Sequence, residues 1–497
     1  MKNLYGFLCV LLLCPFAATS SSAATITVKA GGNLQAALNA ALPGDTILLQ
    51  AGATFTGNFT LPLKTGTSYI TIRSSASDAQ LPAAGVRMTP KYAALLAKIK
   101  GAGSSYALRT ANSAHHWRLQ FVEIVGNANG LYEVVRLGTG SETTTGSQPR
   151  DIIFDRVYIH GDPVKGSRRG IALNGGNTTI KNSYISGIQA SGLDTQAIAG
   201  WNGTGPYRIE NNYLSAGAEN IMFGGADPKI ANLVPSDITI RRNLFTKNLA
   251  WRGTTITVKN LLELKNARRV LIEGNRFQYN WKQNQNGYAM VLMPANSGSA
   301  PWTAVQDVTI RLNRFDHIAG GIAIAGKDKV DGSAITSRIL IQNNLLTDVS
   351  KTKWGGTGVF IVTGDAATDV TVDHNTVIGD GNAIVNGYGL GNVRFKYTNN
   401  MSQHYRDGIY GDGYGGGLVS INKYFIGSVI RRNVLAGGVA SRYPTDNFFP
   451  TAAEFLNHFV NAAAGDYHLA TWSPFNAAGT DGKDVGVNVD AVTAALK

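Results

Sequence analysis

The stretch IRRNLF, residues 240–245, is one copy of a motif that recurs along the chain. The motif has an apolar residue, two residues of any kind, asparagine, one further residue and a second apolar residue. Its clearest copies place the asparagine at seven positions: Asn212, Asn243, Asn275, Asn313, Asn344, Asn375 and Asn433. Weaker copies place Val157, Ser183 and Asn400 there. The first six asparagines are separated by 31, 32, 38, 31 and 31 residues, which predicts a solenoid of stacked units.

Each repeat is predicted to be a coil of short β-strands rather than a pair of helices. In DVTIRLNRFD, residues 307–316, apolar and polar residues alternate with a period of two, which is typical of strands. Such coils stack about 4.8 Å apart and form parallel sheets. Asparagine tolerates the left-handed conformation of a sharp bend, and stacked amides can hydrogen-bond to each other. We therefore expect the repeated asparagines to be structural.

The chain is predicted to divide into three parts. Residues 1–24 have the features of an export signal, with Lys2, a short apolar stretch and small residues before a cleavage position near Ala24. Residues 25–440 form the coils, and residues 441–497, where the repeat is lost, form C-terminal strands and a cap. Both cysteines, Cys9 and Cys14, lie in the signal. We therefore expect a secreted or periplasmic protein without disulfide bonds.

A short helix is expected before the first coils, in GGNLQAALNAALPGD, residues 31–45. Asn33 can cap it, and Pro43 and Gly44 end it. Such a helix closes the open end of a β-stack. Together with the repeat, this arrangement resembles the right-handed parallel β-helix of the pectate-lyase type over roughly residues 25–435. The resemblance implies an all-β solenoid with an N-terminal cap helix, a fold that hosts lyases, hydrolases, epimerases and phage adhesins.

The charge of the chain favours an acidic partner. Among 497 residues the formal net charge is +13, with a pI near 9.5. For an exported protein we expect this partner to be an acidic polysaccharide rather than nucleic acid. Beyond the signal, no run of 18 apolar residues predicts a membrane span. We expect the protein to act as a monomer.

A second strand precedes the asparagine motif in each coil, and these strands can be aligned by their apolar pairs. The pairs are Ile171/Leu173, Ile198/Gly200, Ile221/Phe223, Leu262/Leu264, Met290/Leu292 and Ile322/Ile324. If they face inward, their neighbours face outward. The predicted outward columns are Asn174, Trp201, Gly224 and Lys265; Ala172, Ala199, Met222 and Glu263; and Gly170, Ala197, Asn220 and Leu261.

These columns predict a sugar-binding groove on the outer wall. Gly224 and Gly225 leave a gap beside an aromatic ring and several polar groups. An aromatic ring can stack on the apolar face of a sugar while polar groups fix its hydroxyls. The expected substrate-binding residues are Trp201, Asn202, Asn220 and Asn174.

The chemistry that best fits this groove is β-elimination on a uronate polymer. That reaction needs neutralisation of the uronate carboxylate, a base for the C5 proton and an acid for the leaving oxygen. We expect Lys265 to be the base, and the other catalytic candidates are Arg169, Tyr288 and His160. Three carboxylates on successive coils could hold Ca²⁺ through oxygen ligands: Glu219, Glu263 and Asp194.

The stretch LLELKNARRVLIEGNRF, residues 261–277, resembles the chondroitinase-B-like and alginate lyases of this fold. Members of that family carry an acidic residue shortly before a catalytic lysine, and the next asparagine motif follows. The resemblance implies that Lys265 is the base. The family presents an arginine one coil later, where this chain has Met293, so the acid is expected from Arg169 or Tyr288.

Two alternatives remain open from the sequence. A glycoside hydrolase on the same fold needs carboxylates about 5–9 Å apart, and Asp194, Glu219 and Glu263 lie on successive coils. A non-catalytic protein that binds polysaccharide would need the groove alone. Unsaturated products distinguish a lyase from both.

Overall fold

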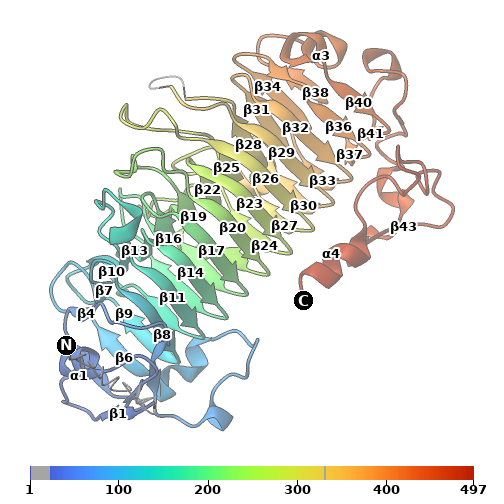
Figure 1. Cartoon of the computed structure of the whole chain (residues 1–497). Helices are drawn as coiled ribbons and strands as arrows, with labels where there is room; N and C mark the ends of the chain where they lie inside the picture. Colours follow the sequence, from blue (N-terminus) through green and yellow to red (C-terminus); the bar gives the residue numbers. More distant parts are fainter. Residues whose placement is uncertain (2–22, 329–331) are drawn as a thin grey trace.

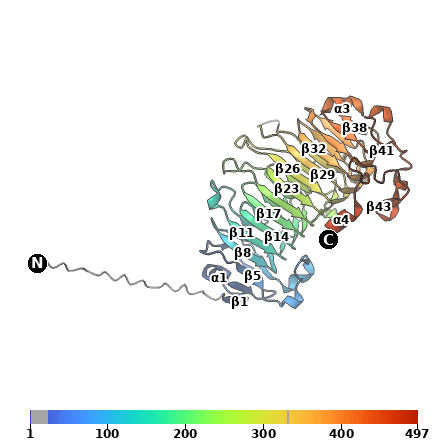
Figure 2. The same cartoon turned by 45° about the vertical axis from the view of Figure 1, so that its right-hand side comes forward.

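The chain forms a long, right-handed parallel β-helix in the computed structural model, which describes residue 1 and residues 23–328 and 332–497. The export signal predicted over residues 1–24 lies almost wholly outside the described residues. The all-β solenoid predicted from the asparagine repeat is confirmed. Figures 1 and 2 show the coils stacked from the N-terminal end to the C-terminal end.

Three parallel sheets run the length of the described coils. Sheet A contains β1 (Thr25–Val28), β2 (Thr46–Leu49), β5 (Ile70–Ser74), β8 (His115–Gln120), β11 (Arg150–Asp155), β14 (Gly176–Lys181), β17 (Gly205–Glu210), β20 (Ser236–Arg241), β23 (Ala267–Glu273), β26 (Val305–Arg311), β29 (Ser337–Gln342), β32 (Thr368–Asp373), β35 (Asn392–Val393), β36 (Lys396–Thr398), β39 (Phe425–Ile426) and β40 (Val429–Arg431).

Sheet B follows sheet A within each coil. It contains β3 (Thr54–Thr56), β6 (Ala97–Lys100), β9 (Val122–Val125), β12 (Tyr158–His160), β15 (Tyr184–Ile188), β18 (Tyr213–Ala216), β21 (Leu244–Thr246), β24 (Arg276–Asn280), β27 (Arg314–Ile318), β30 (Leu345–Ser350), β33 (Thr376–Asp380), β37 (Met401–Gln403) and β41 (Val434–Ala436).

Sheet C completes each coil. It contains β4 (Phe59–Leu61), β7 (Leu108–Thr110), β10 (Leu131–Leu137), β13 (Ser167–Leu173), β16 (Gln196–Gly200), β19 (Glu219–Phe223), β22 (Leu262–Leu264), β25 (Tyr288–Leu292), β28 (Gly320–Ala325), β31 (Ile361–Gly364), β34 (Val385–Tyr388) and β38 (Ile409–Gly411).

Short helices lie at the ends and in the loops. The α-helices are α1 (Leu34–Ala40), α2 (Lys351–Trp354), α3 (Leu418–Tyr424) and α4 (Val489–Ala495). The 3₁₀ helices are η1 (Asp78–Gln80), η2 (Pro90–Leu95), η3 (Thr145–Ser147), η4 (Leu249–Trp251), η5 (Ala440–Arg442), η6 (Phe455–His458) and η7 (Ala462–Ala464). None of the helices in the described part of the chain is long and apolar enough to cross a membrane.

The interior is one continuous apolar core built from the three sheets. In sheet C the register joins the apolar residues that the sequence aligned: Ile171 with Ile198, Ile198 with Ile221, Ile221 with Leu262, Leu262 with Met290, and Met290 with Ile322. All of these side chains are buried. The predicted alignment is therefore confirmed residue by residue.

Helices close both ends of this core. Asn33 caps α1 by accepting a hydrogen bond from the Ala36 N–H, and α1 buries Leu34 and Leu38 against the first coils. This is the cap helix expected from the sequence. At the other end α3 lies over the last coils of sheets C and A and contributes Ile421 and Tyr424 to the core. Both helices shield apolar side chains and sheet edges that would otherwise face solvent.

The asparagine ladder lies at the corner between sheets A and B. Each Oδ1 accepts hydrogen bonds from the main-chain N–H and the side-chain amide of the preceding ladder asparagine, as from Asn243 to Asn275 at 2.9 and 3.0 Å. Ser183 continues the ladder toward the N-terminus by donating to Asn212. Asn400 is a full member, and Asn447, which the motif did not reveal, ends it.

The sequence led us to expect the ladder asparagine itself in the left-handed conformation. In the structure, the left-handed residue of each corner is instead the residue before the asparagine. Positive φ angles of 51–63° occur at Asn211, Arg242, Gly274, Leu312, Asn343, His374, Asn399 and Arg432. The residues of this set other than Gly274 have a Cβ, which makes the left-handed conformation energetically unfavourable for them. The stacked amide bonds that follow each of them hold the bend in place.

The C-terminal segment turns back along this corner. β42 (Phe459–Asn461) and β43 (Asp466–Leu469) form an antiparallel pair, and α4 then lies beside the middle coils (Figures 1 and 2). Gly274 is needed where α4 ends, because a Cβ on it would lie 2.2 Å from the Ala495 carbonyl oxygen.

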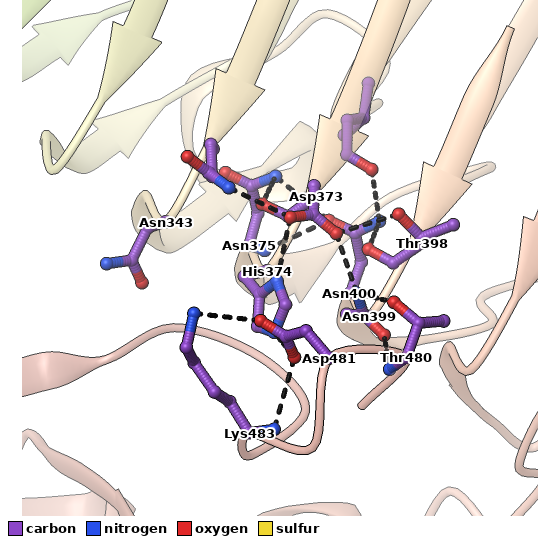
Figure 3. A network of polar contacts seen from close by, with 12 residues as sticks. Asn343, Asp373, His374, Asn375, Thr398, Asn399, Asn400, Thr480, Asp481 and Lys483 are labelled. Carbon is purple, nitrogen blue, oxygen red and sulfur yellow. Dashed lines mark hydrogen bonds and ion pairs between the residues drawn. The ribbon is translucent and has the colours of Figure 1, made fainter. Parts of the chain in front are cut away.

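Polar contacts tie this segment to the ladder corner (Figure 3). Thr480 exchanges hydrogen bonds with the Asn399 side chain at 2.8 and 2.9 Å. His374 lies between Asp373, at 2.8 Å, and Asp481, at 3.4 Å. Burial would raise the pKa of Asp373, but hydrogen bonds led by that from His374 outweigh it and lower the pKa to about 2.

Replacing one ladder asparagine should destabilise the whole solenoid. Asn275→Ala leaves the Asn243 N–H and the Ile240 carbonyl without their partners in a buried corner. We expect the free energy of unfolding to fall by about 2–4 kcal/mol. Urea unfolding followed by far-UV circular dichroism measures this, with Asn422→Ala on the exposed side of α3 as the control. Equal midpoints for the two variants would contradict a stabilising ladder.

Candidate functional site

The outer face of sheet C carries two rows of side chains that run along the helix axis. The register joins the central row into one continuous line: Arg109, Arg136, Ala172, Ala199, Met222, Glu263, Val291, Ala323, Val362, Asn386 and Tyr410. The edge row lies beside it, toward sheet B: Glu133, Arg169, Gln196 and Glu219. Charged groups gather where these rows pass the middle coils.

Asn220 does not face outward, so this part of the predicted columns is wrong. The N–H groups of Asn220 and Ile221 both donate to the Leu261 carbonyl, at 3.1 and 3.3 Å. This irregular pairing turns both residues toward the interior and leaves Glu219 in the edge row. The Asn220 amide then donates to the carbonyls of Leu214 and Thr246. A strict period of two could not reveal this bend.

Three cations reach the surface of the groove, with 12%, 18% and 24% of their side chains exposed: Arg169, Lys259 and Lys265. Under them lie three carboxylates that expose only 4%, 1% and 3%: Glu133, Glu219 and Glu263. Each cation is paired: Arg169 Nη1 lies 3.4 Å from Glu133 Oε1, Lys259 Nζ 4.0 Å from Glu219 Oε1, and Lys265 Nζ 3.5 Å from Glu263 Oε1. The face offered to a ligand is therefore cationic.

The buried carboxylates differ from ordinary glutamates in their protonation. Burial, and after it the nearby charge of Glu263, raises the pKa of Glu219 to about 8 against the hydrogen bond from Gln196. Lys259 behaves in the opposite sense. Burial would lower its pKa, but a 2.5 Å hydrogen bond to Asp194 and the charge of Glu219 outweigh burial and raise it. Lys259 therefore stays a cation, whereas Glu219 is protonated at neutral pH.

Aromatic rings hold the arginine side chain in place. The guanidinium of Arg169 lies 4.8 Å from the ring centre of Trp201 and 5.3 Å from that of Tyr132, which are cation–π distances. Its Nε is buried and has no hydrogen-bond partner. Gly224 keeps the wall low beside Lys265, since a Cβ there would lie 2.8 Å from the Lys265 Cβ. Arg169, Trp201 and Lys265 thus lie on the outer side of neighbouring coils of sheet C, and Glu219 is buried among them.

A buried lysine lies under Glu219, at the bend between sheets B and C. Lys247 Nζ donates to the carbonyls of residues 216–218 at 2.7–3.1 Å and to Asn220 Oδ1 at 3.3 Å. Burial lowers the pKa of Lys247 to about 7, and the charge of Glu219 opposes this. The main-chain carbonyls of this bend and the Asn220 amide surround the amino group of Lys247. This contact explains the unusual sequence of the bend.

Three predicted site residues have structural surroundings instead. Asn174 and Asn202 are buried: Asn174 Oδ1 accepts from the N–H groups of Trp201 and Asn202, and Asn202 Oδ1 accepts from Lys229 and Ile230. His160 is on sheet B, where it stacks on Tyr158 and contacts Glu123 at 3.0 Å. These residues do not line the groove of sheet C.

Tyr288 lies on the coil after Lys265, at the border of the groove. Its ring packs in a small apolar cluster on the outer face of sheet C, and its hydroxyl lies 3.5 Å from Thr357 Oγ1. Burial raises the pKa of Tyr288 despite that hydrogen bond, so the phenol keeps its proton at neutral pH. It remains able to donate a proton.

The sequence prediction missed five residues of the site: Glu133, Arg136, Gln196, Lys259 and Asn260. Glu133 and Arg136 lie in LYEVVRL, residues 131–137, a copy of the second strand one coil before the aligned set. Extending the alignment to that copy would have found them. Gln196 is the first residue of β16, and Lys259 and Asn260 lie just before β22. These residues are at the entry to a strand of sheet C, where the alternation with a period of two does not hold.

The three carboxylates expected to bind calcium do not form a shared ligand set. Among the described residues, no three histidine, cysteine, aspartate or glutamate side chains converge as a metal site. Asp194 is half exposed and paired with Lys259. Two buried amide oxygens without hydrogen-bond partners occur on the coils next to Glu219: Gln196 Oε1, whose Nε2 donates to Glu219 Oε2, and Asn260 Oδ1. Amide and carboxylate oxygens are the ligands that Ca²⁺ takes.

The chain is similar to one family model and to several solved structures. The family model described as right handed beta helix region matches residues 169–377. Solved structures similar to the chain include an alginate lyase from Paenibacillus sp. str. FPU-7 (17% identity, TM-score 0.36, covering 79% of this chain and 99% of that one) and pectate lyase Pel9A (13%, 0.42, 94% and 96%). A GH87 alpha-1,3-glucanase from Streptomyces thermodiastaticus strain HF3-3 is also similar (13%, 0.47, 88% and 72%). No curated protein sequence matches the chain.

Glu219 should make stability depend on pH. Because its folded pKa of about 8 is above the ordinary 4.5, its stabilising contribution is complete below pH 4.5 and is lost as pH rises toward 8. Glu219→Gln, which mimics the protonated form, should therefore become more stable than the parent protein by up to about 1.4 kcal/mol per pH unit in that window. Urea midpoints between pH 5 and 9 measure this.

Glu210→Gln, on the outer face of β17, is the matched control for that experiment. It should follow the parent protein across the whole pH range. A Glu219→Gln variant that also runs parallel to the parent would mean that Glu219 is already ionised at low pH in the folded protein.

Proposed function

We propose that this protein is an exported polysaccharide lyase that cleaves an acidic, uronate-containing polysaccharide by β-elimination in the groove of sheet C. The observation that carries the proposal is the layering of charge, with Arg169, Lys259 and Lys265 at the surface and their carboxylate partners buried beneath. A groove built this way binds an anion and leaves amine groups next to it.

The buried carboxylates support the cations without competing for the ligand. Desolvated ammonium and guanidinium groups need a partner. Glu133 and Glu263 lie beneath Arg169 and Lys265, and Lys259 is paired with the half-exposed Asp194. A uronate carboxylate would contact the exposed parts of these cations. Fixed charges around that carboxylate stabilise the enolate-like charge that develops when the C5 proton leaves.

The roles of the residues follow from their positions. Arg169 and Lys259 bind the uronate carboxylate, and Lys265 takes the C5 proton. The bond between C4 and the leaving oxygen breaks as the C4–C5 double bond forms, and the Tyr288 hydroxyl supplies the proton that the leaving oxygen needs. Trp201 supports Arg169 and offers its ring edge to the neighbouring sugar.

Calcium fits the amide and carboxylate oxygens beneath this surface. Glu219, Glu263, Gln196 and Asn260 would hold it, and a bound Ca²⁺ would add positive charge near the uronate carboxylate. The ion would also favour the ionised form of Glu219, whose proton it would displace.

A glycoside hydrolase is the second candidate, and one observation favours it. Glu219 and Glu263 are neighbouring buried carboxyl groups, and Glu219 is protonated at neutral pH, as the general acid of a hydrolase must be. Against this, both carboxylates lie beneath the lysines rather than at the surface of the groove. The products decide between the two reactions, because a lyase leaves an ultraviolet-absorbing double bond and a hydrolase does not.

Lys265→Ala should reduce turnover by about 10²–10⁴-fold, because it removes the proton acceptor while the fold remains. The rate is followed by the ultraviolet absorbance of unsaturated ends on a series of acidic polysaccharides, together with an assay for reducing ends. Lys282→Ala, an exposed lysine away from the groove, should match the parent protein. Full activity in Lys265→Ala would place the base elsewhere, and reducing ends without absorbance would favour the hydrolase.

Calcium should raise the thermal midpoint of the parent protein, by an amount equivalent to about 2.7 kcal/mol at a concentration 100 times its Kd. Glu263→Gln should abolish that shift, since it removes a ligand charge. Asp194→Asn should retain the shift, because Asp194 lies outside the proposed ligand set. Differential scanning calorimetry with and without a chelator measures all three proteins. If calcium leaves the thermal midpoint of the parent protein unchanged, the protein's own cations neutralise the uronate carboxylate without the metal.

A further inference from the structure

The groove of sheet C is cationic on the N-terminal side of Lys265. In the central row Arg109 and Arg136 lie on neighbouring coils, and both guanidinium groups face the ring of Tyr106, at 5.1 and 5.4 Å from its centre. In the next coil Arg168 and Arg169 face the ring of Tyr132, at 4.8 and 5.3 Å. This side of the groove alternates arginines with aromatic rings.

These arginines retain donors for a ligand. The Nε atoms of Arg168 and Arg169 are buried without hydrogen-bond partners. Arg136 shares Glu133 with Arg169, so one carboxylate serves two guanidinium groups. A 570 Å³ cavity opens beside them and is lined by Tyr132, Arg136, Lys165 and Arg168, among others. Several anionic groups can be bound here at once.

The C-terminal side of the same groove has a different surface. After Glu263 the central row continues with Val291, Ala323 and Val362. Ala323 and Val362 belong to an apolar cluster on the outer face that also includes three tyrosines: Tyr288, Tyr388 and Tyr410. Carbon-rich and aromatic surfaces of this kind stack on the apolar faces of uncharged sugar rings.

The charge near this apolar side is negative. Asp412 accepts a hydrogen bond from Asn386 of the central row. Burial raises the pKa of the Tyr388 hydroxyl, and the charges of Asp365 and Asp412 act in the same direction. A uronate placed here would lose water and would be repelled by these aspartates. An uncharged sugar would meet neither cost.

The two sides are long enough to hold several sugars each. Arg136 precedes Glu263 by four steps of the register, and Tyr410 follows it by five. At about 4.8 Å per coil these steps span roughly 19 and 24 Å. Lys265 lies at the boundary between the two surfaces.

We infer that the groove binds a polysaccharide at the junction between an acidic tract and a neutral tract, with the uronates on the N-terminal coils and the uncharged sugars on the C-terminal coils. This inference rests on the proposed function for the identity of the polymer as a uronate polysaccharide. It adds that the polysaccharide binds in one orientation along the helix axis. It also adds a preference for chains with separate charged and uncharged blocks over uniformly charged chains.

Binding to polymers that differ only in charge pattern tests the inference. The Lys265→Ala variant is used, so that no cleavage is needed, and its retardation is measured in gels containing galacturonan or alginate. Each polymer is supplied as the free acid and after esterification of carboxylates in blocks. The block-esterified form should bind at least about tenfold more tightly than the free acid, equivalent to about 1.4 kcal/mol.

Two further substitutions, added to Lys265→Ala, separate the two sides. Arg136→Ala should weaken binding to both forms and reduce the loss of affinity on adding salt. Tyr388→Ala should remove the preference for the block-esterified form and leave binding to the free acid unchanged. Arg338→Ala on the outer face of sheet A and Tyr213→Ala on that of sheet B are controls and should change neither.

The inference is overturned if the free acid binds as tightly as the block-esterified polymer, if Tyr388→Ala keeps the preference, or if none of these polymers binds. Failure of the proposed lyase activity would give a different result. In that case the preference and its loss in Tyr388→Ala would persist, while the protein without the Lys265→Ala change would form no unsaturated ends on any of the polymers.

Discussion

Parallel pairing between successive coils is the constraint on which the rest of this structure depends. Each strand satisfies its main-chain groups through the coil before and the coil after, so equivalent residues are stacked at the spacing of neighbouring strands. Side chains of one kind therefore meet along the axis. The asparagine ladder benefits from this arrangement, because an amide both donates and accepts. Ionised side chains in one row repel each other unless something is placed between them.

The groove shows how the chain meets that difficulty. Where arginines occupy neighbouring coils, the guanidinium groups of both contact one tyrosine ring. Where lysines occur, carboxylates lie beneath them. Glu219 and Glu263 are themselves carboxyl groups on neighbouring coils, and burial together with the charge of Glu263 raises the pKa of Glu219 so that it retains its proton. The protonation of the site thus follows from the geometry of stacking as much as from any single residue.

The fold and the rows of sheet C could be predicted because the repeat fixes the register. The alignment that paired Ile171 with Ile198 and Ile221 with Leu262 holds in the structure, and it placed Lys265, Glu263, Trp201 and Arg169 near one groove. It failed at the bend before β19 and β22, where a period of two reverses the facing of Asn220. For Lys259 and Lys247 there is a further reason, since their partners, Asp194 and residues 216–218, are distant in sequence.

The C-terminal segment gives the solenoid a property that stacking alone does not. In an array held together by neighbour contacts, each coil loosens with little effect on distant ones, and the last coils fray first. Here residues 480–495 touch coils as far apart as Asn399 and Gly274. The C-terminal segment therefore connects coils that are not neighbours in the stack. Opening of the terminal coils is thereby coupled to the middle of the molecule, next to the coils that carry Lys265.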